Sequence, residues 1–326
     1  MKRILTGLKP SGELTLGSLI GGIRQTVKYQ EEYESFIFVP DMHAITVRQD
    51  PKLLKERIRK NVALYIASGI DPEKNIIYLQ SENLYHANLS WVLECNTYMG
   101  EASRMTQYKD KSSKGENVTV GLFTYPILMA SDILLYDADL IPVGIDQKQH
   151  VELARDLAER FNKNYGDTFK VPEPLIPRVG AKIMDLQNPT KKMSKSDDSY
   201  KGVILLLDEE KVIRKKIMSA VTDSENKVYY DVENKPGISN LLTIYASLKE
   251  ISIEETENHF KDYNYGNLKK EVADQVVEVL TNIQNRYNEL INSNEIDKIL
   301  DRGKEATNKI AKDKVEEVFN KVGFGR

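Results

Sequence analysis

The sequence has one cysteine, Cys95, among its 326 residues. A single thiol cannot form a disulfide within the chain, and it cannot supply a cysteine-rich metal site. Disulfides are typical of secreted proteins, and cysteine-rich sites are typical of proteins stabilised by a metal ion. Because this chain can form neither, we expect a protein of the reducing cytoplasm. No apolar run approaches the roughly 18 residues of a membrane-spanning helix. The stretch from Met1 to Gly7 also reaches glycine before a signal-length apolar run can form.

The sequence also lacks an excess of positive charge, because its formal net charge is −3 at pH 7. Proteins that bind nucleic acid over a broad surface are usually basic, so any RNA-binding surface here must be local. Hydrophobic residues make up 40% and charged residues 29%, as in a globular protein. A chain of this length is expected to form two domains.

What the sequence does contain is a short string of cationic and hydroxyl side chains at 191–196, KKMSKS. Lysine is a mobile point charge, and several lysines in one loop can follow the negative charge that moves when a phosphate bond breaks. A solvated basic loop would have the same composition. The rest of the chain must decide between these interpretations.

The N-terminal residues predict a strand, a tight turn and a helix. Residues 3–8 are strand-like, 9–12 (KPSG) form a turn, and apolar residues at helical spacing begin near Thr15. The backbone N–H groups at such a helix start can face an anion. Gly17 has no side chain to keep a flat ring away from the backbone, and Ser18 could add a hydroxyl. An ordinary strand-to-helix turn is the alternative.

Continuous apolar runs alternate with amphipathic segments through the first half of the chain. Strands are predicted at 36–39, 76–80 and 140–143, with a helix at 51–68. This alternation predicts a doubly wound parallel sheet. His43 follows one strand end, where it is either a wall of the ligand crevice or a loop histidine. The prolines at 172, 174 and 177 predict a connection, and residues 181–186 a strand that leads to the lysine string.

A helix over 124–136 carries Tyr125, Met129 and Asp132 on one face, together with Tyr136. An aspartate in an aromatic and thioether stripe is costly to bury unless a donor satisfies it. We therefore hypothesise that Tyr125 and Met129 wall an aromatic pocket and that Asp132 accepts a hydrogen bond from its occupant. An indole N–H is only a donor, so it fits a carboxylate. A surface carboxylate is the alternative.

The remaining segments are less specific. The loop 108–115 is basic, and one of its lysines, Lys111, could swing toward a triphosphate. Asp146 stands where a helix begins and could simply cap it. Beyond residue 196 the pattern is helical, with a basic side at 214–216 (RKK) that could bind RNA.

Four motifs together resemble the bacterial-type tryptophanyl-tRNA synthetases, which are class I aminoacyl-tRNA synthetases. They are 10–18 (PSG followed by TLGS), 129–136 (MASDILLY), 143–150 (VGIDQKQH) and 192–196 (KMSKS). The last motif marks the class, whereas the aspartate-bearing helix and the 143–150 string mark the tryptophan branch. Two positions depart from the family pattern, because Lys9 and Ser18 replace a common glutamine and asparagine.

The resemblance implies a Rossmann-type catalytic domain at 1–196 with an inserted helical connecting segment at about 100–175, followed by a helical anticodon-binding domain at 197–326. It implies a cytoplasmic homodimer that activates L-tryptophan with ATP and transfers it to tRNA(Trp). ATP would enter with Mg²⁺, and no dedicated protein metal site is expected.

The resemblance also implies site residues. Lys192 and Lys195 would stabilise the leaving diphosphate, with Lys111 assisting. The implied nucleotide contacts are Lys9, Pro10, Ser11, Gly17, Ser18, Gly144, Ile145, Asp146, Ile183, Lys192, Met193, Ser194, Lys195 and Ser196. The implied tryptophan contacts are His43, Tyr125, Met129, Asp132 and Gln147.

Three alternatives remain at this stage. A tyrosyl-tRNA synthetase shares the fold and the lysine string. A synthetase-like paralogue that binds RNA or an amino acid without catalysis would be expected to have a damaged lysine string, and this one is intact. A small-molecule adenylyltransferase would not need the helical C-terminal part.

Overall fold

The computed structural model describes residues 1–10, 12–106, 108–109, 118–176, 182–193 and 200–326, with the side chain of Asp146 also left undescribed. Several predicted site residues fall outside this part of the chain, so their contacts stay predictions. They are Ser11, Lys111, Ser194, Lys195 and Ser196.

The centre of the fold is a five-stranded parallel sheet with strand order β3-β2-β1-β4-β5. The order reverses at β1, because β2 and β3 lie on one side of it and β4 and β5 on the other. Such a reversal leaves a crevice beyond the carboxyl ends of the strands. The predicted doubly wound fold is therefore confirmed. The strands are β1 (Arg3–Gly7), β2 (Glu34–Val39), β3 (Asn75–Leu79), β4 (Leu140–Pro142) and β5 (Glu173–Leu175).

The proline-containing segment predicted as a connection includes the edge strand β5. Pro174 lies inside it and pairs with Ile141 of β4. Proline lacks an N–H to donate, so an edge strand, which needs hydrogen bonds on one side only, tolerates it more readily than the middle of a sheet. β4 and β5 both fall within the predicted connecting segment, so that segment contributes strands as well as helices.

The strand predicted over 181–186 does not join the sheet in its described part, 182–186. Its backbone pairs with the residues that follow: Met193 N donates to Ile183 O at 2.9 Å, and Asp185 N donates to Lys191 O at 2.9 Å. A bridge between Met184 and Lys192 completes this local hairpin. The backbone N–H and C=O groups of residues 183–185 that could have joined the sheet are bonded to residues 191–193.

Helices cover the sheet, and several of them begin with a threonine or aspartate whose side chain caps the helix N-terminus. Thr15 caps the helix after β1, Asp50 caps α4 directly before Pro51, and Thr119 caps α8. Tyr136, predicted on the α8 face, follows the end of that helix. These elements are α1 (Leu16–Ser18), the π-helical turn η1 (Leu19–Ile23), α2 (Arg24–Tyr29), α3 (Asp41–Ala44), α4 (Pro51–Ala67), η2 (Gln80–Glu82), α5 (Tyr85–Cys95), α6 (Met99–Ala102), α8 (Val120–Leu134), η3 (Ile145–Gln147) and α9 (Lys148–Tyr165).

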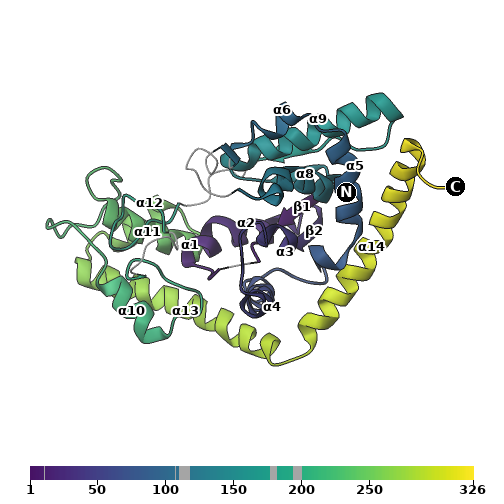
Figure 1. The fold of residues 1–326 in the computed structure, drawn as a ribbon. Helices are drawn as coiled ribbons and strands as arrows, with labels where there is room; N and C mark the ends of the chain where they lie inside the picture. The colour runs from purple at the N-terminus through teal and green to yellow at the C-terminus, as the bar shows by residue number, and fades with distance from the viewer. Residues whose placement is uncertain (11, 107, 110–117, 177–181, 194–199) are drawn as a thin grey trace.

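The C-terminal part is helical, as predicted. Its helices are α10 (Glu210–Met218), α11 (Pro236–Lys249), α12 (Ile253–Phe260), α13 (Tyr265–Ile291) and α14 (Glu295–Val322). The long α14 runs back along the sheet and packs on its β3 edge (Figure 1). Gly303 permits this approach, because a Cβ atom there would lie 1.8 Å from the carbonyl oxygen of Ile77.

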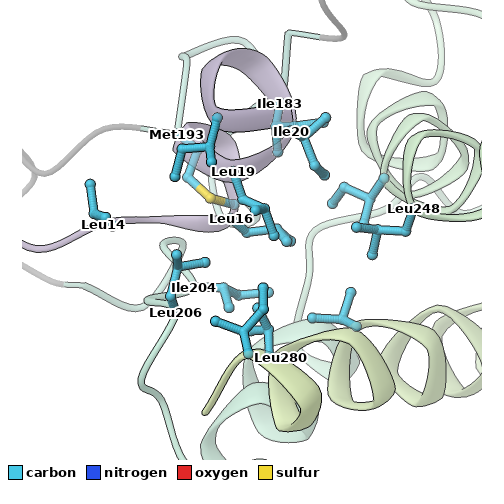
Figure 2. Packing of buried hydrophobic residues seen from close by; sticks show 14 of the residues in the cluster. Leu14, Leu16, Leu19, Ile20, Ile183, Met193, Ile204, Leu206, Leu248 and Leu280 are labelled. Carbon is cyan, nitrogen blue, oxygen red and sulfur yellow. The ribbon is translucent and has the colours of Figure 1, made fainter. Parts of the chain in front are cut away.

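One hydrophobic cluster joins the helix after β1 to the C-terminal helices. Leu16, Leu19 and Ile20 meet Met193 and Leu280 in this cluster (Figure 2). The backbone also links these regions, since Leu16 N donates to Ile204 O at 2.9 Å and Leu206 N donates to Leu14 O at 3.0 Å. The chain therefore contacts the start of α1 again at residues 204–206, and the domain boundary at 196 stays a prediction. Among the described residues, no helix combines the length and apolar character needed to cross a bilayer.

Candidate active site

A cavity of about 910 Å³ lies beyond the carboxyl ends of β1, β2 and β4, where the strand order reverses. Residues from four separate motifs meet in its wall. The predicted site residues that line it are Lys9, Pro10, Gly17, Ser18, His43, Tyr125, Met129, Asp132, Gly144, Gln147, Lys192 and Met193. The tertiary fold thus brings the N-terminal turn, the α8 face and the start of the lysine string around one space.

The turn after β1 is fixed from behind by a buried amide. Asn61 of α4 is 1% exposed, and its Nδ2 atom donates to the carbonyl oxygens of Lys9 at 3.2 Å and Gly12 at 3.3 Å. Gly12 has a φ of 89°, in the left-handed region that favours glycine. This turn therefore presents a fixed edge to the cavity.

The N-terminus of α1 is closed by a reciprocal cap. The Oγ1 atom of Thr15 accepts from Ser18 N at 3.1 Å, and the two hydroxyl oxygens are 3.1 Å apart. The hydroxyl of Ser18 is thus already engaged with Thr15, and its predicted contact with a nucleotide stays a prediction. Gly17 lies against the lysine string, since a Cβ atom there would be 3.4 Å from Met193 Cβ.

The described residues on both sides of the lysine string are firmly anchored. Met193 is 3% exposed and pairs with Ile183, while Leu186 N donates to Gly202 O at 2.9 Å. The Oδ1 atom of Asp185 accepts from the backbone N–H groups of Gln187 and Asn188 at 2.7 and 2.9 Å. These contacts hold Lys192 at the cavity wall.

Two residues predicted to contact the nucleotide do not line this cavity. The side chain of Ile183 is 1% exposed and belongs to the hydrophobic cluster beneath Met193. Ile145 is 80% exposed, and neither residue lines the cavity. Ile183 therefore supports the lysine string from behind.

Asp132 is fully buried, which excludes the surface-carboxylate alternative. Its Oδ2 atom lies 2.7 Å from His43 Nε2, and its Oδ1 atom lies 2.7 Å from Gln80 Nε2 and 2.6 Å from His86 Nδ1. Burial by itself would raise the pKa of this carboxyl, but the charges and hydrogen bonds of His43 and His86 outweigh it and lower the pKa to about 2. Asp132 is therefore an ionised acceptor at neutral pH.

A second, partly buried network orients Tyr125. Its hydroxyl lies 2.9 Å from His150 Nε2, and His150 Nδ1 lies 2.8 Å from Gln147 Oε1. Because an amide oxygen only accepts, His150 carries a proton on Nδ1, and in its neutral form Nε2 accepts from Tyr125. Burial raises the pKa of Tyr125 to about 12, so the phenol keeps its proton.

The sequence interpretation missed the residues behind the cavity wall. Gln80 and His86 carried no signal, because each lies about 50 positions from Asp132 and outside the recognised motifs. Asn61 lies in the amphipathic helix α4, whose sequence pattern gives no sign that one of its residues holds the turn after β1. His150 was inside the 143–150 string, but no role was predicted for it.

The described residues contain no group of three or more His, Cys, Asp or Glu side chains placed to hold a metal ion. What they offer is a helix N-terminus and a lysine at one part of a cavity and an ionised, buried carboxylate at another. This combination suits an anionic nucleotide next to a smaller molecule with a ring N–H donor.

Comparison with known proteins agrees with this chemistry. A family model described as tRNA synthetases class I (W and Y) matches residues 1–281. The tryptophan–tRNA ligase of Bacillus anthracis is 52% identical over 326 residues, covering 100% of this chain and 99% of the relative. That of Bacillus subtilis is 54% identical over 323 residues, covering 99% and 98%. The crystal structure of the Campylobacter jejuni tryptophanyl-tRNA synthetase complexed with ADP and tryptophan is similar, with 37% identity, a TM-score of 0.86, and 99% and 100% of the two chains covered.

Proposed function

The chain belongs to the class I tRNA synthetases of the tryptophan and tyrosine group, and within it to the bacterial tryptophan–tRNA ligases, and we propose how its cavity carries out their reaction. In the first step, a carboxylate oxygen of tryptophan attacks the α-phosphorus of ATP. The bond to the leaving diphosphate breaks, and tryptophanyl-adenylate forms. In the second step, a terminal ribose hydroxyl of the tRNA attacks the adenylate carbonyl and AMP leaves.

The nucleotide occupies the part of the cavity between the first turn of α1 and the lysine string. Gly17 and Gly144 line the cavity without side chains, so a flat base or ribose can approach the backbone. Lys192 neutralises charge on the departing diphosphate, with Lys195 and Lys111 as further cations. Lys9 adds a positive group near the α-phosphate or the substrate carboxylate.

Tryptophan occupies the part next to α8. Asp132 accepts the indole N–H, Tyr125 and Met129 wall the ring, and Gln147 lies where it can contact the amino acid backbone. The single observation that carries this proposal is the complete burial of Asp132 in a cavity wall shared with Lys192. Asp132 already accepts from His43, Gln80 and His86, and phenylalanine would leave one acceptor direction of its carboxylate unused, which favours tryptophan over phenylalanine.

ATP enters as its Mg²⁺ complex in this proposal. The phosphate oxygens of the nucleotide would hold the cation, because the described residues lack a carboxylate or histidine cluster for it. The bound cation would lower the negative charge of the phosphates.

The chain acts as a homodimer in this proposal, and an apolar stripe along α5 supports this state. Leu84, Ala87, Trp91 and Cys95 are spaced by three or four residues and are all exposed. Trp91 is 61% exposed and Leu84 is 75% exposed, so Trp91 is not part of the core. An exposed apolar stripe of this kind, interrupted here by Asn88, can form a contact surface between proteins. A second copy of the chain is the occupant that we assign to it.

The cytoplasmic location and the anticodon-binding role of residues 197–326 also belong to the proposal. The basic side of α10 gives the latter little support. Arg214 is paired with Glu210 at 2.8 Å, and Lys216 is paired with Asp208 at 2.7 Å. Lys215, the third residue of this basic side, is exposed.

ATP–diphosphate exchange with each of the twenty amino acids tests the proposed function. We expect exchange that depends on tryptophan and is far weaker with tyrosine and phenylalanine. Exchange that is fastest with tyrosine would favour the tyrosine enzyme. A complete absence of exchange would favour a non-catalytic paralogue.

A further inference from the structure

A chain of buried polar groups stands behind Asp132, on the side away from the cavity. His86 of α5 is fully buried and does not line the cavity. Its Nδ1 atom is 2.6 Å from Asp132 Oδ1, and its Nε2 atom is 2.9 Å from the hydroxyl of Tyr136. That hydroxyl also accepts from Asn83 Nδ2 at 3.0 Å. Tyr136 and Asn83 are at most 1% exposed, so water does not compete for these bonds.

The order of donors along this chain determines where the histidine proton lies. The amide nitrogen of Asn83 can only donate, so the oxygen of Tyr136 accepts from it. The ionised carboxylate of Asp132 can only accept, so His86 Nδ1 must donate to it, and in a neutral imidazole Nε2 is left to accept from the Tyr136 hydroxyl. The remaining proton of His86 then sits on Nδ1, toward Asp132. An imidazolium would also carry a proton there, so Nδ1 donates to Asp132 in either form.

The same contacts distinguish the two oxygens of Asp132. Oδ1 accepts from Gln80 and His86, neither of which lines the cavity. A carboxylate oxygen has two lone pairs, so Oδ1 is fully used. Oδ2 accepts from His43, which lines the cavity, and retains one lone pair. Oδ2 is therefore the atom on the cavity side.

We propose that His86 is a positioning residue for tryptophan recognition: it holds Oδ1 of Asp132 so that Oδ2 faces the cavity and accepts the indole N–H. Tyr136 and Asn83 fix the ring of His86 in the required orientation. This inference rests on the proposed function of Asp132 and adds to it the groups that set the direction of the carboxylate.

A role in packing alone is the competing explanation. The ring of His86 lies 5.7 Å from that of Tyr136, 6.1 Å from that of Tyr78 and 6.5 Å from that of Phe38, measured between centroids. Packing depends on these rings, whereas positioning depends on the Tyr136 hydroxyl and the His86 Nδ1 proton. Tyr136→Phe keeps the ring and deletes the hydroxyl, so it separates the two roles.

The experiment measures ATP–diphosphate exchange by the full chain with tryptophan and with its benzothiophene analogue, in which sulfur replaces the ring N–H. For Tyr136→Phe we expect the KM for tryptophan to rise roughly tenfold, the loss of about one hydrogen bond. The KM for ATP should stay unchanged. The preference for tryptophan over the analogue should fall by a similar factor, because a carboxylate that points in another direction no longer accepts a hydrogen bond from the indole N–H.

Two substitutions of His86 provide a rescue test. His86→Asn keeps an amide donor near the position of Nδ1 and should retain most of the preference for tryptophan over the analogue. His86→Leu removes the donor and should lose it. Tyr265→Phe is the matched control, because it deletes another largely buried tyrosine hydroxyl, one bonded to Asp223 and Lys235 in the helical part. It should leave both substrates unaffected.

Wild-type values for Tyr136→Phe and His86→Leu would overturn the inference. Equal increases in the KM for tryptophan and for ATP, with an unchanged preference between tryptophan and the analogue, would also overturn it, because they would indicate general damage. A wild-type chain that shows no tryptophan-dependent exchange would overturn the proposed function itself. The two failures are therefore distinguishable.

Discussion

The Nε2 atom of His43 lies 2.7 Å from the Oδ2 atom of Asp132, across the wall of the cavity. The oxygen proposed to read the indole ring thus shares its lone pairs between a protein donor and the substrate. Such an arrangement keeps a buried carboxylate satisfied and leaves one direction open for recognition. The first prediction concerns this carboxylate.

Asp132→Asn should raise the KM for tryptophan on the order of 100-fold, because the amide loses the charge that strengthens the bond to the indole N–H. The KM for ATP should change little. Steady-state exchange at varied concentrations of each substrate measures both values. Asp274→Asn, which removes an exposed carboxylate of α13, is the control and should behave as wild type. Equal changes in both KM values would make Asp132 structural.

Lys192→Ala should lower kcat for exchange by a factor of roughly 100, as expected for one group that stabilises developing charge. Lys195→Ala should have a comparable effect. The KM for tryptophan should be nearly constant in both variants. Lys191→Ala removes the neighbouring exposed lysine, which does not line the cavity, and should be close to wild type. If Lys191→Ala and Lys192→Ala were equally slow, the overall positive charge of the loop, and not the position of Lys192, would explain the effect.

Gly303→Ala should destabilise the chain by about 1–3 kcal/mol, because the added methyl group collides with backbone. Its Cβ atom would lie 1.8 Å from the carbonyl oxygen of Ile77 in β3, and α14 would have to move off the sheet edge. Urea unfolding followed by circular dichroism measures the difference. Gly100→Ala meets nothing within 4 Å and should be neutral or slightly stabilising. A neutral result at Gly303 would disprove the close packing of α14.

The lowered pKa of Asp132 predicts how acid affects stability. Burial raises this pKa, but His43 and His86 lower it further, to about 2, below the value of an unfolded aspartate. The ionised group therefore stabilises the fold above the unfolded pKa, and this stabilisation is lost as the pH falls toward the folded pKa. Relative to Asp132→Asn, the wild type should lose about 1 kcal/mol of unfolding free energy between pH 6 and pH 3. Denaturant titrations at both pH values test this, and a constant difference would contradict it.

Trp91→Glu should weaken the proposed dimer, because it places a charge in the middle of the apolar stripe of α5. Light scattering after size exclusion should show a mass that falls toward that of a monomer at micromolar concentration. Val232→Glu, at another exposed apolar side chain, is the control and should leave the mass unchanged. A wild-type chain that is monomeric at all concentrations would remove the proposed role of the stripe.

Local patterns determined much of this protein. The apolar residues within 36–39 and 76–80 predicted β2 and β3, because a strand covered on both faces can contain few polar residues. The lysines at 191–195 and the aspartate in an aromatic stripe indicated the family chemistry only in combination with the other motifs, because a solvated basic loop has the same composition as the lysine string. These signals depend on residues within a few positions of one another, so they can be recognised in the sequence.

Only the tertiary structure decided how those pieces act together. It placed Asp132 between His43, Gln80 and His86, three donors from other segments. It also placed Pro174 in an edge strand, where a missing N–H costs little, and used residues 182–186 to brace the lysine string. The physical reason is the same in each case. Hydrogen-bond satisfaction of a buried group is settled by whichever segment the fold brings within about 3 Å, and sequence distance carries no information about that partner.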